Sequence, residues 1–135
     1  MITQNTALFT IFGATGDLAH RKLYPSLFRL YKKGFIKDNF AVIGTARREW
    51  SDVHFREVVL DSIKDLIEDK EDAISFAAHF YYIAHNVNDA EHYIKLKDLS
   101  ESLDAKYSLS GNRIFYLAMS PEFFGNKKKK LKEQK

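Results

Sequence analysis

Small residues at a regular spacing follow the first apolar run of the chain, as a phosphate-binding turn requires. The segment Gly13–Ala19 (GATGDLA) places Gly, Gly and Ala three positions apart, directly after the apolar run Ala7–Phe12. Gly13 permits a tight turn, Gly16 lets the backbone approach a pyrophosphate, and Ala19 lets a helix pack closely on the strand. Backbone N–H groups and the positive end of the helix dipole would then face the phosphates. The motif predicts a dinucleotide-binding turn, and the alternative is an ordinary strand-to-helix turn.

Two arginines follow the second apolar run, where a dinucleotide-binding fold holds the adenosine ribose. Phe40–Gly44 is followed after two residues by Arg47 and Arg48, and Glu49 is the first acidic residue. Proteins that prefer NAD usually have Asp or Glu here, which accepts a hydrogen bond from the ribose 2′-hydroxyl. Guanidinium groups suit the 2′-phosphate of NADP instead, because they bind it through paired, charge-assisted hydrogen bonds. We therefore predict NADP as the coenzyme, with a solvated basic turn as the alternative.

Four short apolar runs alternate with helical patterns and would position these two turns. The predicted strands span Ala7–Phe12, Phe40–Gly44, Phe80–Ala84 and Arg113–Met119. They are almost continuously apolar, which is typical of strands covered on both faces. The alternation predicts a parallel sheet with right-handed crossovers, an α/β, Rossmann-like fold. Because it has about four strands rather than six, the sheet is expected to be incomplete and to leave an open apolar edge.

Apolar positions three and four apart predict the helices between these strands. Pro25 is expected to kink or restart the first helix. Ser51 is expected to cap the second helix, with Trp50 and Phe55 at the spacing of a hydrophobic staple. Asp89 is expected to cap the last helix. The predicted stripes are Leu23, Leu27, Leu30 and Tyr31, then Phe55, Val59, Ile63 and Leu66, then Tyr93, Leu96, Leu99 and Leu103, with a further helical turn or two over Ala73–His79.

Two other patterns could carry chemistry but are better explained by structure. Tyr93 and Lys97 have the spacing of the Tyr-x-x-x-Lys pair of short-chain reductases, yet they come too early in the order of elements and lack a matching serine. A small reductase using this pair is therefore the weakest function considered. The histidines have no metal-site spacing, so they are read as surface or interface residues and no metal is expected. They are His20, His54, His79, His85 and His92.

The composition excludes several classes of protein. The 135 residues are 45% hydrophobic, too apolar for a disordered chain, and no run approaches the roughly 18 residues of a membrane span. Cysteine is absent, and no basic segment precedes Ala7–Phe12, which together favour a cytoplasmic protein over a secreted one. The net charge of +3 comes from residues 127–135, which hold six lysines and one glutamate. We expect this tail to be disordered, and the protein to bind neither nucleic acid nor a membrane.

Taken together, these residues resemble the N-terminal signature of glucose-6-phosphate dehydrogenase. The resemblance begins with Phe12–Ala19 followed by Arg21–Leu27 (RKLYPSL), and continues through Gly44–Arg47, Gly111–Leu117 and Pro121–Gly125. It implies an enzyme that oxidises glucose 6-phosphate to 6-phosphogluconolactone and reduces NADP, the entry step of the pentose phosphate pathway. It also implies assembly as a homodimer or homotetramer.

The resemblance assigns roles to particular residues. Arg47 would hold the 2′-phosphate, and Lys22 would lie near the reacting end of the site and assist placement of substrate and coenzyme. Asn86 and Val87 would flank the adenosine side, although Asn86 stands where the family often has Asp. The turn bordering the nicotinamide would contain Ala118, Ser120 and Pro121. The residues that would wrap the pyrophosphate are Gly13, Ala14, Thr15, Gly16, Asp17, Leu18, Ala19 and His20.

The family's catalytic segments have no match in this sequence. Neither its Arg-Ile-Asp-His-Tyr-Leu-Gly-Lys segment, which binds sugar phosphate, nor its proton-abstracting histidine–aspartate pair can be found. We therefore expect a truncated chain, in which residues 1–126 form a partial NADP-binding domain, 127–135 form the lysine-rich tail, and the substrate and dimerisation domain is absent. Such a chain would contain no catalytic residue and would be inactive by itself. The alternative is a stand-alone NADP-binding or regulatory module.

Overall fold

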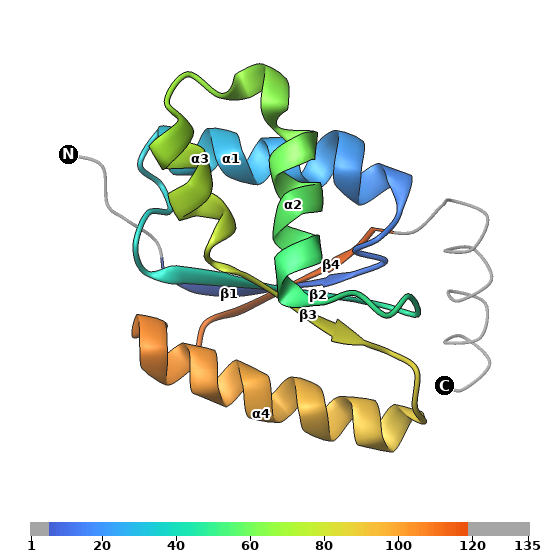
Figure 1. Ribbon diagram of the computed structural model, residues 1–135. Coiled ribbons are helices and arrows are strands. Elements are labelled where there is room, and N and C mark those ends of the chain that lie inside the picture. The colour runs from blue at the N-terminus through green and yellow to red at the C-terminus, as the bar shows by residue number, and fades with distance from the viewer. Residues whose placement is uncertain (1–5, 119–135) are drawn as a thin grey trace.

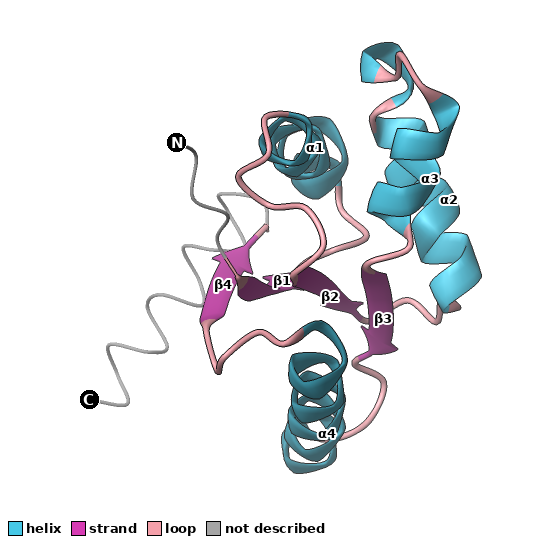
Figure 2. Ribbon diagram, turned by 90° about the vertical axis from the view of Figure 1, so that its left-hand side faces the viewer, coloured by secondary structure: helices cyan, strands magenta, loops and turns pink. Residues whose placement is uncertain are grey.

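A four-stranded parallel sheet lies between two layers of helices (Figures 1 and 2). The computed structural model describes residues 6–118. The strand order is β3-β2-β1-β4, and every neighbouring pair is parallel. This arrangement confirms the predicted Rossmann-like α/β fold. The elements are β1 (Ala7–Phe12), η1 (Ala19–Leu23), α1 (Tyr24–Lys32), β2 (Phe40–Ala46), α2 (Asp52–Ser62), η2 (Lys64–Leu66), α3 (Lys70–Ala77), β3 (Phe80–Ala84), α4 (Asp89–Tyr107) and β4 (Arg113–Leu117).

The two faces of the sheet are covered by very different amounts of apolar side chain. Figure 2 shows α1, α2 and α3 on one face and α4 alone on the other. The first face holds the main core, in which the rings of Tyr24, Phe55 and Phe80 pack edge to face at 5.7–5.8 Å. The second face holds a smaller cluster around Leu8, Ile43 and other buried residues. Because both faces are covered, β1 and the first five residues of β2 are apolar or buried along their lengths.

Several local predictions are confirmed at named residues. The Ser51 side chain accepts a hydrogen bond from His54 N at 3.0 Å, so Ser51 caps α2. The rings of Trp50 and Phe55 lie 6.4 Å apart, as the staple spacing predicts. Pro25 lies in the first turn of α1, where the helix passes from the π-helical segment η1 to regular α-helix without a break, so the proline marks a change of helix type rather than a restart.

Other local predictions are wrong, each for a physical reason. Asn88, rather than Asp89, caps α4, because its side chain accepts from Glu91 N while Asp89 is already helical. Tyr93 is 65% exposed and does not belong to the apolar stripe of α4, whereas His92 is buried and is not a surface histidine. The Asp69 side chain caps α3, which therefore begins before the predicted Ala73.

The β4 strand carries the exposed apolar edge that the incomplete sheet predicts. Within residues 6–118, β4 pairs only with β1. Its side chains Ile114, Phe115, Tyr116 and Leu117 are all exposed, and Phe115 is 61% exposed. No helix in this part of the chain is long and apolar enough to cross a bilayer. The lysine-rich segment 127–135 lies outside the described residues.

Candidate functional site

The glycine-rich turn between β1 and η1 is tied to the end of β2. Gly13 has a φ of 81°, a conformation that glycine adopts without strain. The backbone N–H groups of Gly13 and Ala14 both donate to Thr45 O, at 3.0 and 3.2 Å, and Gly16 N donates to Gly13 O at 3.1 Å. The turn is therefore held in one shape by the protein's own backbone.

The same turn lies next to the residue that follows β4. A Cβ atom on Gly16 would lie 3.3 Å from Gly13 O, which is a crowded contact, and 3.7 Å from Ala118 O, which is ordinary van der Waals contact, so the turn packs against the end of β4. In the sheet, β2 and β3 lie on one side of β1, and β4 lies on the other side of β1. This makes the gap between β1 and β4 a topological switch point, where open α/β sheets bind ligands at the carboxyl ends of their strands.

The Tyr24 side chain supports the glycine-rich turn from the buried core, and the sequence did not predict this role. Its hydroxyl donates to Ala14 O at 2.6 Å in the buried core. Burial, with a smaller effect of Tyr82, raises the pKa of Tyr24 far above its usual range, so the hydroxyl stays a donor. The predicted stripe of this helix did not include Tyr24, but its spacing of three and seven residues from Leu27 and Tyr31 was an available signal of burial, and a buried hydroxyl needs a hydrogen-bond partner.

The loop after β2 presents two arginines on a backbone that β3 holds in place. The Tyr82 hydroxyl donates to Arg48 O at 2.5 Å, and His85 N donates to Ala46 O at 2.7 Å. Burial raises the pKa of Tyr82 to about 12, so this hydroxyl also stays protonated. The Arg47 and Arg48 side chains are exposed, and neither forms a salt bridge with any residue of the described 6–118.

Three other residues predicted for the adenosine and phosphate regions each have a side-chain partner within the protein. The Asn86 side-chain amide donates to Glu49 Oε1, which joins the loop after β3 to the loop after β2. His20 Nε2 lies 3.0 Å from Asp61 Oδ2, so its ring is turned toward α2. Asp17 Oδ2 accepts from Arg21 Nε at 2.6 Å on the exposed side of the helix.

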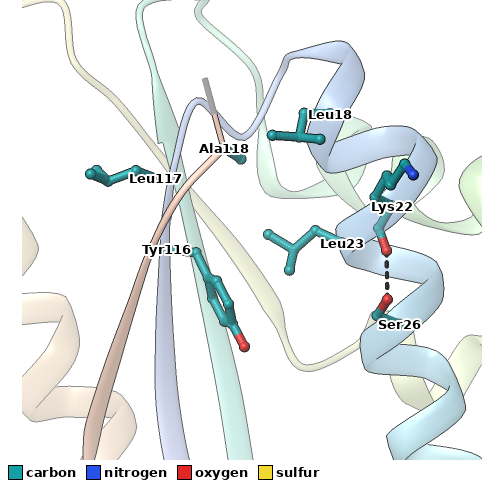
Figure 3. A pocket seen from close by; sticks show the side chains of 7 residues that line it. All are labelled: Leu18, Lys22, Leu23, Ser26, Tyr116, Leu117 and Ala118. Atoms are coloured by element: carbon teal, nitrogen blue, oxygen red, sulfur yellow. Dashed lines mark hydrogen bonds between the residues drawn. The ribbon is translucent and has the colours of Figure 1, made fainter. Parts of the chain in front are cut away.

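An open pocket of about 210 Å³ lies between η1, the start of α1 and β4 (Figure 3). Figure 3 shows the Leu18 and Leu23 side chains reaching from the helix toward β4. The structure thus brings together two residues predicted for the reacting end of the site, Lys22 and Ala118. Ser120 and Pro121 lie outside the described residues. The lining residues are Leu18, Lys22, Leu23, Ser26, Tyr116, Leu117 and Ala118.

Two stacked histidines lie next to Thr45, near the carboxyl end of β2. The rings of His85 and His92 are 3.8 Å apart and nearly parallel. Thr45 Oγ1 donates to Ile83 O at 2.6 Å, so His92 Nε2, 2.7 Å from the same oxygen, is the donor of that second bond. Within residues 6–118, no group of three or more His, Asp or Glu side chains could hold a metal ion.

Folding stability is expected to fall on acidification from about pH 7.5 to 5.5, above the range in which carboxylates titrate. Burial and then the neighbouring His85 lower the pKa of His92, and burial lowers the pKa of His79. Both histidines therefore take up protons less readily in the folded protein than in the unfolded chain, whose histidines titrate near pH 6.5, so stability is lost as the pH falls from there toward the lowered pKa values. Urea denaturation across this range measures the effect.

The control for this pH dependence removes both groups. A His79→Gln/His92→Gln variant should be less stable than the parent at pH 7.5, but its free energy of unfolding should vary less over the same range. An equally steep dependence in this variant would contradict the assignment to these two histidines.

Comparison with known proteins gives one consistent result. The family described as "Glucose-6-phosphate dehydrogenase, NAD binding domain" matches residues 10–135. The glucose-6-phosphate 1-dehydrogenase of Streptococcus pneumoniae is 56% identical over 94% of this chain and 26% of that protein, and the Leuconostoc mesenteroides enzyme is 48% identical over 99% and 28%. A solved glucose-6-phosphate dehydrogenase in complex with its substrate glucose-6-phosphate is similar, with a TM-score of 0.77 and 34% identity over 92% of this chain and 27% of that chain. The chain therefore spans about a quarter of the length of these relatives.

Proposed function

The chain belongs to the glucose-6-phosphate dehydrogenase family and corresponds to its NAD binding domain, and from this we propose that it holds NADP for the oxidation of glucose 6-phosphate. In that reaction C1 of the sugar loses a hydride to the nicotinamide and its hydroxyl loses a proton, which gives 6-phosphogluconolactone and NADPH. The contribution of this chain is to bind and orient the coenzyme.

The observation that carries the proposal is the glycine-rich turn at the switch point between β1 and β4. Gly16 has no Cβ where one would crowd Gly13 O, so a pyrophosphate can approach the backbone there. The helix that follows begins at Asp17 and runs through η1 into α1, so its N-terminal N–H groups and dipole favour the phosphate charge. The whole segment Gly13 to His20 is proposed to wrap this group.

The exposed arginines after β2 support NADP rather than NAD. Arg47 and Arg48 are paired with no described carboxylate, so their guanidinium groups are available to a 2′-phosphate. We assign the 2′-phosphate to Arg47 with Arg48 beside it, and the adenosine to the loop of Asn86 and Val87.

The pocket beside β4 supports the assignment of the reacting end. Lys22 and Ala118 line it together. A lysine at this position supplies a positive charge that would help to place the phosphorylated sugar and the coenzyme. Ala118, Ser120 and Pro121 are proposed to border the nicotinamide. Assembly as a homodimer or homotetramer remains a prediction of the resemblance, and a cytoplasmic location remains a prediction of the composition and the N-terminal sequence.

A protein of these 135 residues is expected to bind NADP but not to form NADPH from glucose 6-phosphate. Among the described residues that line the pocket there is no carboxylate or imidazole to take the hydroxyl proton as a general base. Calorimetric titration with NADP, followed by an absorbance assay for NADPH at saturating sugar phosphate, measures both properties. NADPH formation would contradict the assignment of a binding role alone, and the lack of NADP binding would contradict the proposed function itself.

A further inference from the structure

One carboxylate lies beside the two arginines at the end of β2. Glu49 follows Arg47 and Arg48 directly, and all three side chains are exposed. A carboxylate at this place repels a 2′-phosphate and favours the 2′-hydroxyl of NAD, from which it can accept a hydrogen bond. The loop therefore contains groups that favour either coenzyme.

The structure turns Glu49 toward the next loop of the sheet. Its Oε1 accepts a hydrogen bond from the Asn86 amide. Tyr82 contacts the chain on either side of Glu49: its hydroxyl donates to the backbone Arg48 O, and its N–H donates to the side-chain Oδ1 of Asp52 at 2.7 Å. Within the described residues, Glu49 forms no ion pair with either arginine. Asn86 thus holds the carboxylate on the β3 side of the loop.

We propose that the Glu49–Asn86 hydrogen bond is a coenzyme-specificity device, which keeps Glu49 away from Arg47 and Arg48 and so favours NADP over NAD. This inference rests on the proposed NADP-binding function. Glu49 acts through its charge, and Asn86 is a positioning residue that acts through Glu49. An amide suits this role because it donates to the carboxylate without adding a charge next to the phosphate.

The proposal predicts opposite effects for the two partners. Glu49→Gln removes a negative charge near the 2′-phosphate, so the ratio of the Kd for NAD to the Kd for NADP should rise about three- to tenfold. Asn86→Ala releases Glu49 to pair with an arginine or to accept from a 2′-hydroxyl, so the ratio should fall by a similar factor. Asn86→Asp both releases Glu49 and adds a charge, so the ratio should fall further.

Titration of the 135-residue chain with NADP and with NAD tests these effects. Glu101→Gln is the matched control, because it removes one exposed carboxylate on α4 about 18 Å along the helix from Asp89, and it should leave the ratio unchanged. In the Glu49→Gln background, Asn86→Ala should have little further effect, since no charge remains to be released. The gain of Glu49→Gln should also shrink as salt rises.

The outcomes separate this inference from the function on which it rests. If Arg47→Ala weakens NADP binding but Glu49→Gln and Asn86→Ala leave the ratio of the two Kd values unchanged, the specificity device is overturned and the NADP site stands. A lower NADP affinity in Glu49→Gln would also overturn it. If the parent chain binds no NADP, both the function and the inference fall.

Discussion

Replacement of Arg47 by alanine is expected to weaken NADP binding about 30- to 100-fold while leaving NAD binding nearly unchanged. The Arg47 guanidinium is exposed on a loop whose backbone is held by hydrogen bonds from Tyr82 and His85. The loop therefore does not have to become ordered when the coenzyme binds. Loss of its paired hydrogen bonds would leave the 2′-phosphate with less compensating charge. Because NAD lacks that phosphate, only NADP should lose affinity. Calorimetric titration with both coenzymes measures the difference.

Two further variants control this experiment. Arg29→Ala removes an exposed guanidinium from α1, on another element, and should leave both affinities unchanged. Arg47→Lys retains the charge but not the planar pair of donors, so it should fall between the parent and the alanine variant. Equal losses for NADP and NAD in Arg47→Ala would show that the residue does not act on the 2′-phosphate.

Addition of a single methyl group at Gly44 is expected to destabilise the fold by about 1–3 kcal/mol. A Cβ on Gly44 would lie 2.5 Å from Phe55 Cζ and 2.8 Å from Ala14 Cβ, and both neighbours are buried. The residue is paired with Ile11 in the middle of the sheet, so the backbone cannot easily move away. Gly44→Ala should therefore lower the free energy of unfolding in urea. NADP affinity should fall as well, because Ala14 belongs to the turn that is proposed to bind the phosphates.

The close contact with Phe55 supplies the control for this prediction. In a Phe55→Leu background, which lacks the ring atoms nearest to the added methyl, Gly44→Ala should cost less than in the parent, so the two changes should not be additive. A Gly44→Ala protein as stable as the parent would contradict the packing argument.

The sequence alone predicted the features that depend on neighbouring residues. The apolar runs located β1 and β3 at their observed bounds, the serine before α2 predicted its cap, and the Gly13–Ala19 spacing predicted the turn. Such patterns are readable because a strand or a cap is specified by residues a few positions apart. The cap of α4 was predicted one residue late, at Asp89 instead of Asn88, since either side chain can cap a helix.

The tertiary structure alone decided which distant residues meet. The strand order β3-β2-β1-β4 places Gly16 beside Ala118 and Lys22 in the same pocket as Tyr116. Likewise, the Tyr24 hydroxyl under Ala14 and the Asn86 amide on Glu49 join segments that no periodic pattern connects. The sequence by itself determined that this chain has a glycine-rich strand-to-helix turn and an arginine-bearing loop. Only the order of the strands brought them to the same edge of the sheet, because contacts between strand ends depend on how the sheet is assembled and not on local spacing.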